Sequence, residues 1–515
     1  MAGIRTLGRL TVLNAVNTLL ALLNTVIVAY YFGTGRPVEV YLAAAGLYAS
    51  LMSLAQTGQV SEILLPTYHQ VRERLGAEVA FTTYTVLVNR LLLVLGLLCA
   101  GCWIFAPILA LWRVPGFESS EVATVSEMFR WILPLVLLQL AAELFKTLAN
   151  AESLFGGPEI LTSAARVASL IALVLLASRM GPWALVAGLW CSVMVEILGS
   201  LWLLRRRSYR YALQLRLPDS AGDIRLFARL GGTLPYVLLT QVYLFLLDAG
   251  LSRLAQGSFA VFRYASMIWS RSQGVFLRPI SITFFTEFSE SNARASHRLQ
   301  GLMDQALARV LAISALVAVA VLSGAAPVFR SLWQGERFPA EQIHDLVWLL
   351  GCFYVLLPVM GTAVILRKVG VSLGRVSEIY LGLAAVQVLS AGLAWTIVPV
   401  VGVAGALLVT SINLIGFCVV PWFVLKLSGA NLELRYPYGR AWRWLVAASV
   451  GVAIAWTMQQ AIPGIEPGLS GRILEFASGG VLAVIGLLVA FCISLALAVP
   501  ESRWIAARVR RILTP

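Results

Sequence analysis

The chain has 515 residues, of which 59% are hydrophobic and only 12% are charged. Soluble domains average about 45–50% apolar and about 25% charged residues, so the composition excludes an ordinary soluble protein and predicts that most of the chain lies in lipid. The net charge of +14 does not indicate nucleic-acid binding, because the basic residues are dispersed over short connections and do not gather on one solvated face.

Apolar stretches of helical length follow one another from end to end of the sequence. A transmembrane helix needs about 20 apolar residues, and about fourteen stretches approach or exceed that length. The predicted fold class is therefore all-α, a polytopic membrane protein. The expected spans cover residues 10–31, 40–65, 82–110, 126–149, 159–178, 183–204, 228–252, 258–285, 306–332, 346–366, 376–398, 401–425, 444–462 and 476–499.

The first two spans form a predicted membrane hairpin from Asn24 to Pro66. The short polar turn Gly33-Thr34-Gly35-Arg36-Pro37 separates them. A carboxylate, Glu39, follows directly after the turn, where it would act as an outer gate or as a partner for an arginine.

Basic residues are unequally divided between alternate connections. They gather near residues 5–9, 72–74, 205–229, 294–298, 367–375, 426–443 and 503–511, whereas the other connections hold single arginines. Basic loops stay in the cytoplasm, so both termini are predicted to be cytoplasmic, with contact to anionic headgroups. The first apolar run lacks a small-residue cleavage site and reads as a span, not as a cleavable signal peptide.

A polar stretch divides the chain into two halves. The predicted domains are an N-terminal six-helix bundle (1–204), a basic cytoplasmic linker (205–223), a second six-helix bundle (224–426) and two additional helices with a basic tail (427–515). A weak echo of the first hairpin follows the linker. Repeated halves are typical of transporters with a substrate site between them.

Charged residues inside spans are expensive and indicate function. Arg263, Arg271 and Arg278 are spaced eight and seven apart, about two helical turns each, so they form one stripe along the eighth span. Such a stripe either lines a polar cavity that binds phosphate or meets carboxylates from the two halves in ion pairs. The candidate carboxylates are Glu39, Glu62, Asp248 and Glu143.

Further cations lie in the first half. Arg90 either lines a cavity or extends to the cytoplasmic interface. Lys146 lies three residues after Glu143, so the two share a helical face and can neutralise each other; a structural pair and a substrate contact both remain open. Arg166 lies among small residues that favour either close packing or a groove. Arg253 lies near Asp248 and suggests a structural ion pair.

Motifs for covalent chemistry are missing from the sequence. The six cysteines fall in apolar runs, the three histidines share no neighbourhood, and no Walker A, metal-ligand or nucleophile-elbow spacing occurs. No cofactor and no metal are therefore predicted, and a transporter is favoured over an enzyme.

Several motifs together resemble the MurJ/MviN lipid flippases of the multidrug/oligosaccharidyl-lipid/polysaccharide (MOP) exporter superfamily. They are Phe32-Gly33-x-Gly35, Gly58-x-x-Ser61 with Pro66, Leu148-Ala149-Asn150-Ala151 with Phe155, and Tyr264-Ala265 followed by Gly274. The resemblance implies two bundles around a V-shaped cavity and inversion of an undecaprenyl-pyrophosphate-linked saccharide by alternating access. It also implies a multi-pass protein of a bacterial inner membrane that serves peptidoglycan or polysaccharide assembly in the cell envelope.

One departure from the family concerns its cavity arginines. Lipid II flippases use arginines on helices 1, 2 and 8, and the matching positions here are Thr18, Asn24, Met52 and Met267. The stripe on the eighth span would replace them from another face of that helix.

Two alternatives to a flippase remain open. The first is a transport-inactive scaffold that partners a polysaccharide synthase, a glycosyltransferase or another envelope-assembly enzyme; it predicts that ion pairs consume the arginine stripe. The second is a drug or cation antiporter of the same superfamily, which would favour an acidic cavity.

Overall fold

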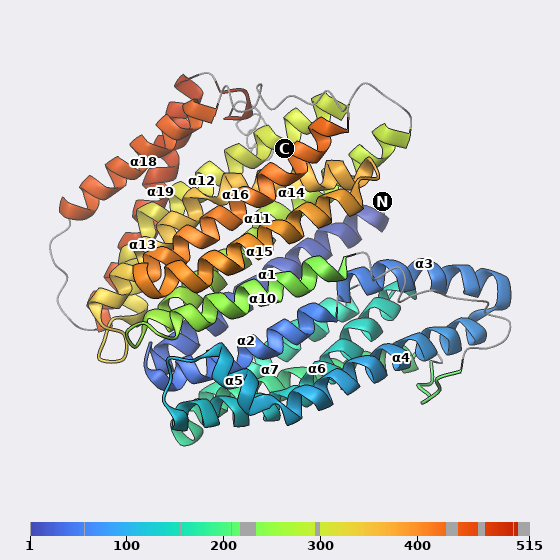
Figure 1. The fold of residues 1–515 in the computed structure, drawn as a ribbon. Coiled ribbons are helices and arrows are strands. Elements are labelled where there is room, and N and C mark those ends of the chain that lie inside the picture. Colours follow the sequence, from blue (N-terminus) through green and yellow to red (C-terminus); the bar gives the residue numbers. More distant parts are fainter. Residues whose placement is uncertain are drawn as a thin grey trace. The chain divides into compact units, whose positions relative to one another are not determined.

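The structure, a computed structural model, describes residues 2–55, 57–154, 156–207, 209–216, 233–293, 299–428, 441–461, 469–497 and 499–502. In this part of the chain every regular element is a helix (Figure 1). Among the described helices, eleven are long and apolar enough to cross a membrane, or twelve if one bent pair counts as a span, close to the number expected. The fold class is therefore all-α and membrane-spanning.

The helices divide into two compact units, Met1–Gln256 and Gly257–Pro515. The unit boundary thus lies after the seventh predicted span, whereas the predicted linker precedes that span. In the first unit the helices are α1 (Ala2–Phe32), α2 (Arg36–Leu54), α3 (Thr57–Leu75), α4 (Ala77–Ile104), α5 (Ala106–Arg113), α6 (Ser119–Ala151), α7 (Gly157–Met180), α8 (Trp183–Arg205) and α10 (Leu234–Leu251).

The second unit contains eight helices in its described part. They are α11 (Ser258–Ala293), α12 (Leu299–Trp333), α13 (Ala340–Val355), α14 (Leu357–Ser372), α15 (Val376–Val401), α16 (Val403–Leu427), α18 (Ala441–Ala461) and α19 (Leu469–Ala496).

The first hairpin forms at the predicted turn. Gly33 has a positive φ of 58°, a conformation that glycine adopts at little cost. Pro37 lies in the first turn of α2, where its missing N–H would have had no helical partner. The sequence therefore fixes both the reversal of the chain and the start of α2.

Three predicted spans are interrupted in the structure. The span expected at 40–65 is two helices, because α2 ends at Leu54 and α3 begins at Thr57. The span expected at 82–110 breaks at Phe105 between α4 and α5. The span expected at 346–366 breaks at Leu356, where α13 and α14 meet at 40°. Pro358 directly follows this break, and a proline within the first turn of a helix is tolerated where one in the interior is not.

The two C-terminal helices pack tightly against α12. A Cβ on Gly324 would lie 2.5 Å from the carbonyl oxygen of Gly479, and one on Gly451 would lie 2.6 Å from that of Gly486. These glycines let the backbones of α12, α18 and α19 approach closely, as small residues do between membrane helices.

Candidate functional site

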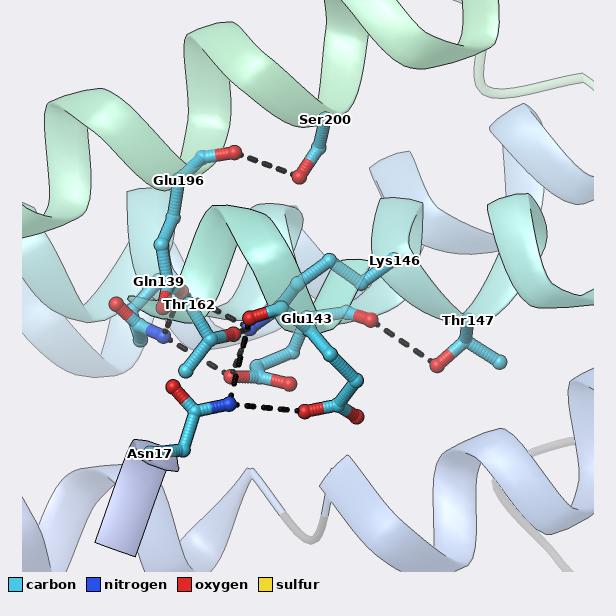
Figure 2. Close-up of polar contacts among 9 residues, drawn as sticks. Asn17, Gln139, Glu143, Lys146, Thr147, Thr162, Glu196 and Ser200 are labelled. Atoms are coloured by element: carbon cyan, nitrogen blue, oxygen red, sulfur yellow. Dashed lines mark hydrogen bonds and ion pairs between the residues drawn. The ribbon is translucent and has the colours of Figure 1, made fainter. Parts of the chain in front are cut away.

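A buried polar cluster lies inside the first unit, centred on Lys146 of α6 (Figure 2). Its Nζ donates hydrogen bonds to Glu143 Oε1 at 2.9 Å, Glu196 Oε2 at 3.0 Å and Thr162 Oγ1 at 3.2 Å. An ammonium group has three N–H donors, so these acceptors satisfy all of them. Lys146 is therefore fully engaged within the protein.

The two carboxylates of this cluster are also joined by an amide. Gln139 Nε2 donates to Glu143 at 3.1 Å and to Glu196 at 2.9 Å. The spacing of Glu143 and Lys146 in the sequence predicts their pairing, whereas no local spacing indicates Glu196 of α8 as a further partner. The sequence does contain an indirect signal for the partner of Glu196. A carboxylate deep in an apolar span needs a cation, and few cations occupy the first-half spans.

Asn17 extends the polar contacts to α1 and α7. Its Nδ2 donates to Glu159 Oε2 at 3.1 Å, and its Oδ1 accepts from Ser163 Oγ at 2.8 Å. Arg166 donates to the main-chain carbonyl oxygen of Asn17. Of the two open interpretations of Arg166, this contact fits close helix packing better than an exposed groove.

A second set of ion pairs lies where α2 begins. Arg36 contacts Glu39 at 2.9 Å and Glu121 at 3.2 Å, and its guanidinium lies 4.5 Å from the ring centroid of Phe117. The Glu39 side chain is almost completely buried. Glu39 therefore has an arginine partner, but that partner comes from its own helix.

Asp248 of α10 pairs with Arg113, the last residue of α5. Both side chains are buried, with relative exposures of 0% and 1%. The Arg113 guanidinium packs directly against Gly46 of α2, so a Cβ at position 46 would collide with it. The sequence suggests Arg253 as an ion-pair partner of Asp248. No sequence pattern indicates Arg113, which lies 135 residues away in the chain.

Arg90 of α4 lies half-buried and donates from Nε to the carbonyl oxygen of Leu215 at 3.0 Å. This contact ties Arg90 to the segment that follows α8, so one donor of its guanidinium group is engaged within the protein.

In the second unit, the candidate arginines lie on α11. Arg263, Met267 and Arg271 follow one another at intervals of four residues, so they lie on adjacent turns of the same face. The expectation that the stripe occupies another face from Met267 is therefore wrong: Met267 lies in its middle. Arg263 and Arg271 are half-buried. The side chains of Arg278 and Glu62 lie outside the described part of the structure.

The opposite face of α11 packs within the second unit. Trp269 stacks on Phe353 of α13 with 5.1 Å between ring centroids, and Ser272 shares a hydrogen bond with Tyr354. These contacts orient the helix, because they fix which of its faces is turned away from α13.

A further polar contact, which the sequence does not predict, joins α15 to α16. Asn413 Nδ2 donates to Gln387 Oε1 at 3.2 Å and to Ser390 Oγ at 2.9 Å, and all three side chains are buried. Single amides in apolar runs carry no distinctive spacing, so the sequence offered no signal for this contact.

Among the described residues, no three His, Cys, Asp or Glu side chains lie close enough together to hold a metal ion. The arrangement can therefore orient and neutralise charges, and α11 presents two guanidinium groups around a methionine.

Comparison with known proteins gives a family match. A family model described as lipid II flippase MurJ matches residues 28–465. A search of curated proteins finds no match.

Among solved structures, a lipid II flippase MurJ in an inward closed conformation has a TM-score of 0.72 at 14% identity. The match covers 92% of this chain and 97% of the flippase chain. An inward-facing multidrug resistance MATE transporter of the MOP superfamily has a TM-score of 0.64 at 16% identity, covering 82% and 98%. A MOP superfamily transporter from Pyrococcus furiosus has a TM-score of 0.58 at 14% identity, covering 83% and 96%. At these identities the likeness concerns the fold.

Proposed function

This chain belongs to the MurJ lipid II flippase family, whose model matches residues 28–465, and from that membership we propose that it moves an undecaprenyl-pyrophosphate-linked saccharide across the cytoplasmic membrane. The cargo is lipid II or an exopolysaccharide repeat unit. Movement occurs by alternating access, without covalent chemistry on the cargo, and both termini are cytoplasmic. The family match carries this proposal.

The physical task explains which residues are needed. A pyrophosphate pays several kcal/mol or more to enter hydrocarbon, so a flippase must offer cations in a wet site while the prenyl tail stays in lipid. Guanidinium groups bind phosphate oxygens through paired N–H donors. Arginines that face a cavity are therefore the residues to look for.

We assign the phosphate contact to the α11 face formed by Arg263 and Arg271, with Arg278 as its extension. Arg263 and Arg271 flank Met267, which stands where lipid II flippases carry an arginine, so they bring positive charge back to the same face.

The test is the accumulation of undecaprenyl-linked intermediates in cells depleted of the protein. Complementation uses wild type, the double variant Arg263→Gln with Arg271→Gln, and a matched control, Arg179→Gln with Arg375→Gln. The control removes two exposed arginines from other helix ends. We expect one lipid-linked saccharide to accumulate on depletion and to be cleared by wild type and control but not by the α11 variant, at equal membrane levels.

A second candidate function is a transport-inactive scaffold for an envelope-assembly enzyme. It is favoured by the engagement of Lys146, Arg166 and Arg113 with partners inside their own unit. In the same experiment a scaffold gives an envelope defect without accumulation of any undecaprenyl-linked intermediate, and the α11 variant complements the defect fully. That result would overturn the flippase proposal.

A further inference from the structure

The chain that follows α8 does not enter the next helix directly but lies along α4. Residues 209–216, which we name the strap, have no helical or strand structure. Tyr209 shares a hydrogen bond with Thr85 at 2.8 Å, and the Tyr211 hydroxyl donates to Asn89 Oδ1 at 2.8 Å. The strap is therefore anchored at its start by two phenol groups.

Asn89 and Arg90 hold the rest of the strap by its backbone. Asn89 Nδ2 donates to the carbonyl oxygens of Ala212 at 2.9 Å and Gln214 at 2.8 Å. Arg90 Nε donates to the carbonyl oxygen of Leu215 at 3.0 Å. These three bonds use only main-chain oxygens, so they leave the side chains of Gln214 and Leu215 unconstrained.

The anchor points lie next to an exposed apolar surface of α4. The α4 side chains from Thr83 to Asn89 are buried, whereas Leu93, Val94 and Leu97 are exposed apolar residues of a candidate span. A helix rises about 1.5 Å per residue, so Arg90 lies roughly one turn from this exposed apolar surface. Leu215, bonded to Arg90, lies at the same level.

The outward side chains of this region combine apolar and basic groups. Leu213 is 84% exposed and Leu215 is 47% exposed. Residues 205–216 contain five arginines and no acidic residue. All five are exposed, and Arg206 lies 3.7 Å above the ring of Trp202, itself exposed at the end of α8. The five are Arg205, Arg206, Arg207, Arg210 and Arg216.

We propose that the strap is a binding site for anionic lipid headgroups, with Leu213 and Leu215 inserted at the headgroup–acyl boundary and Arg210 and Arg216 on the phosphates. Exposed leucines beside clustered arginines are the pattern of segments that lie in a membrane interface. Basic clusters next to a span attract anionic lipids. An acidic soluble protein fits less well, because the two leucines would then remain exposed at the level of lipid. This site is independent of the cargo proposed above.

The test is hydrogen exchange of the full-length protein in nanodiscs of phosphatidylcholine alone or with phosphatidylglycerol. We expect the amides of residues 209–216 to exchange roughly fivefold more slowly with phosphatidylglycerol for each arginine engaged. The Arg210→Gln, Arg216→Gln double variant should lose most of this difference, and so should Leu213→Ser with Leu215→Ser. The segment 334–339, between α12 and α13, is the internal control and should exchange equally in both lipids.

Three outcomes would overturn the proposal. The first is equal exchange of the strap in both lipids, which would leave an acidic protein as the partner to seek. The second is a lipid effect that persists in the arginine variant. The third is equal slowing by inorganic phosphate added to phosphatidylcholine nanodiscs, which would mean that the arginines bind any free anion and not a lipid. Exchange at Asn89 checks in each variant that the strap is still docked on α4.

Discussion

Lys146 of α6 and Glu196 of α8 lie 3.0 Å apart, Nζ to Oε2, although 50 residues separate them in the chain. Both are largely buried. Removing one member of a buried pair leaves the other charge uncompensated, which costs far more than the pair itself contributes. The cluster around Lys146 therefore joins α6 to α8 through charges that must be kept together.

Replacing this lysine should destabilise the protein. We expect Lys146→Met to cost roughly 3 kcal/mol and to lower the thermal midpoint in detergent, because two carboxylates then face each other. Adding Glu196→Gln should restore part of the loss. Lys426→Met, at an exposed position, is the control and should have little effect. An unchanged midpoint for Lys146→Met would mean that the cluster does not hold these helices together.

Gly46 and Arg113 should show strong coupling. A Cβ at position 46 collides with the Arg113 guanidinium, so Gly46→Ala should displace Arg113 from Asp248 and lower the thermal midpoint. In an Arg113→Ala background the same substitution should cost little, since the colliding group is gone. The control is Gly101→Ala in α4, where nothing lies within 4 Å; it should stabilise by up to about 1 kcal/mol. Additive effects of Gly46→Ala and Arg113→Ala would contradict the geometry.

Tyr209 should give the strap a dependence on alkaline pH. Burial raises the pKa of Tyr209 from 10.0 to about 12, against a smaller lowering by the hydrogen bond with Thr85. A raised pKa means that the folded state holds the proton more tightly. The resulting stability is fully present below pH 10 and is lost as the pH rises through about 12.

Tyr209→Phe tests this dependence. Thermal midpoints are compared at pH 9.5 and pH 12, which bracket the ordinary and the raised pKa of Tyr209. We expect the midpoint of the wild type to fall further between these two pH values than the midpoint of the variant. Tyr30→Phe, at an exposed position, should behave as wild type. The same loss in all three proteins would show that other groups determine the alkaline behaviour.

Clearance of the lipid-linked saccharide should depend on the charge at position 267 and not on the shape of the side chain there. Met267 lies between Arg263 and Arg271 on one face of α11, so Met267→Glu would place a carboxylate between the two guanidinium groups that competes with phosphate for them, and we expect it to abolish clearance of the lipid-linked saccharide. Met267→Leu, which conserves volume and costs little in packing, should clear the saccharide as wild type does. Membrane levels of each variant are measured in parallel. Full activity of Met267→Glu would remove this face from the proposed site.

Local patterns predicted much of the fold. Runs of about 20 apolar residues located the spans, and Gly33 with Pro37 located the first turn, because both depend on neighbouring residues alone. The same holds for Glu143 and Lys146, which share a helical face. The breaks at Leu356 and Phe105 escaped prediction, since hydropathy continues smoothly through both.

Long-range partners could not be read from the sequence. Asp248 has a basic neighbour in Arg253, and the structure adds Arg113 as an ion-pair partner, because α10 packs against α2 and α5. The interhelical pairs depend on which helices are adjacent and at what rotation, and neither follows from periodicity. The relation of Met267 to Arg263 and Arg271 is different, because intervals of four residues on one helix put the three on the same face and the sequence alone contains them.

The close contacts between α12 and α19 have a practical consequence for observing movement. Where Gly324 and Gly479 meet, backbone lies against backbone, and no flexible side chain intervenes to absorb displacement. Arg330 and Glu475 add an ion pair at 3.1 Å between the same two helices. We expect helices joined in this way to move together, so a fluorescent probe on the exposed Ile473 of α19 would report the motion of α12 without any label placed near the cargo.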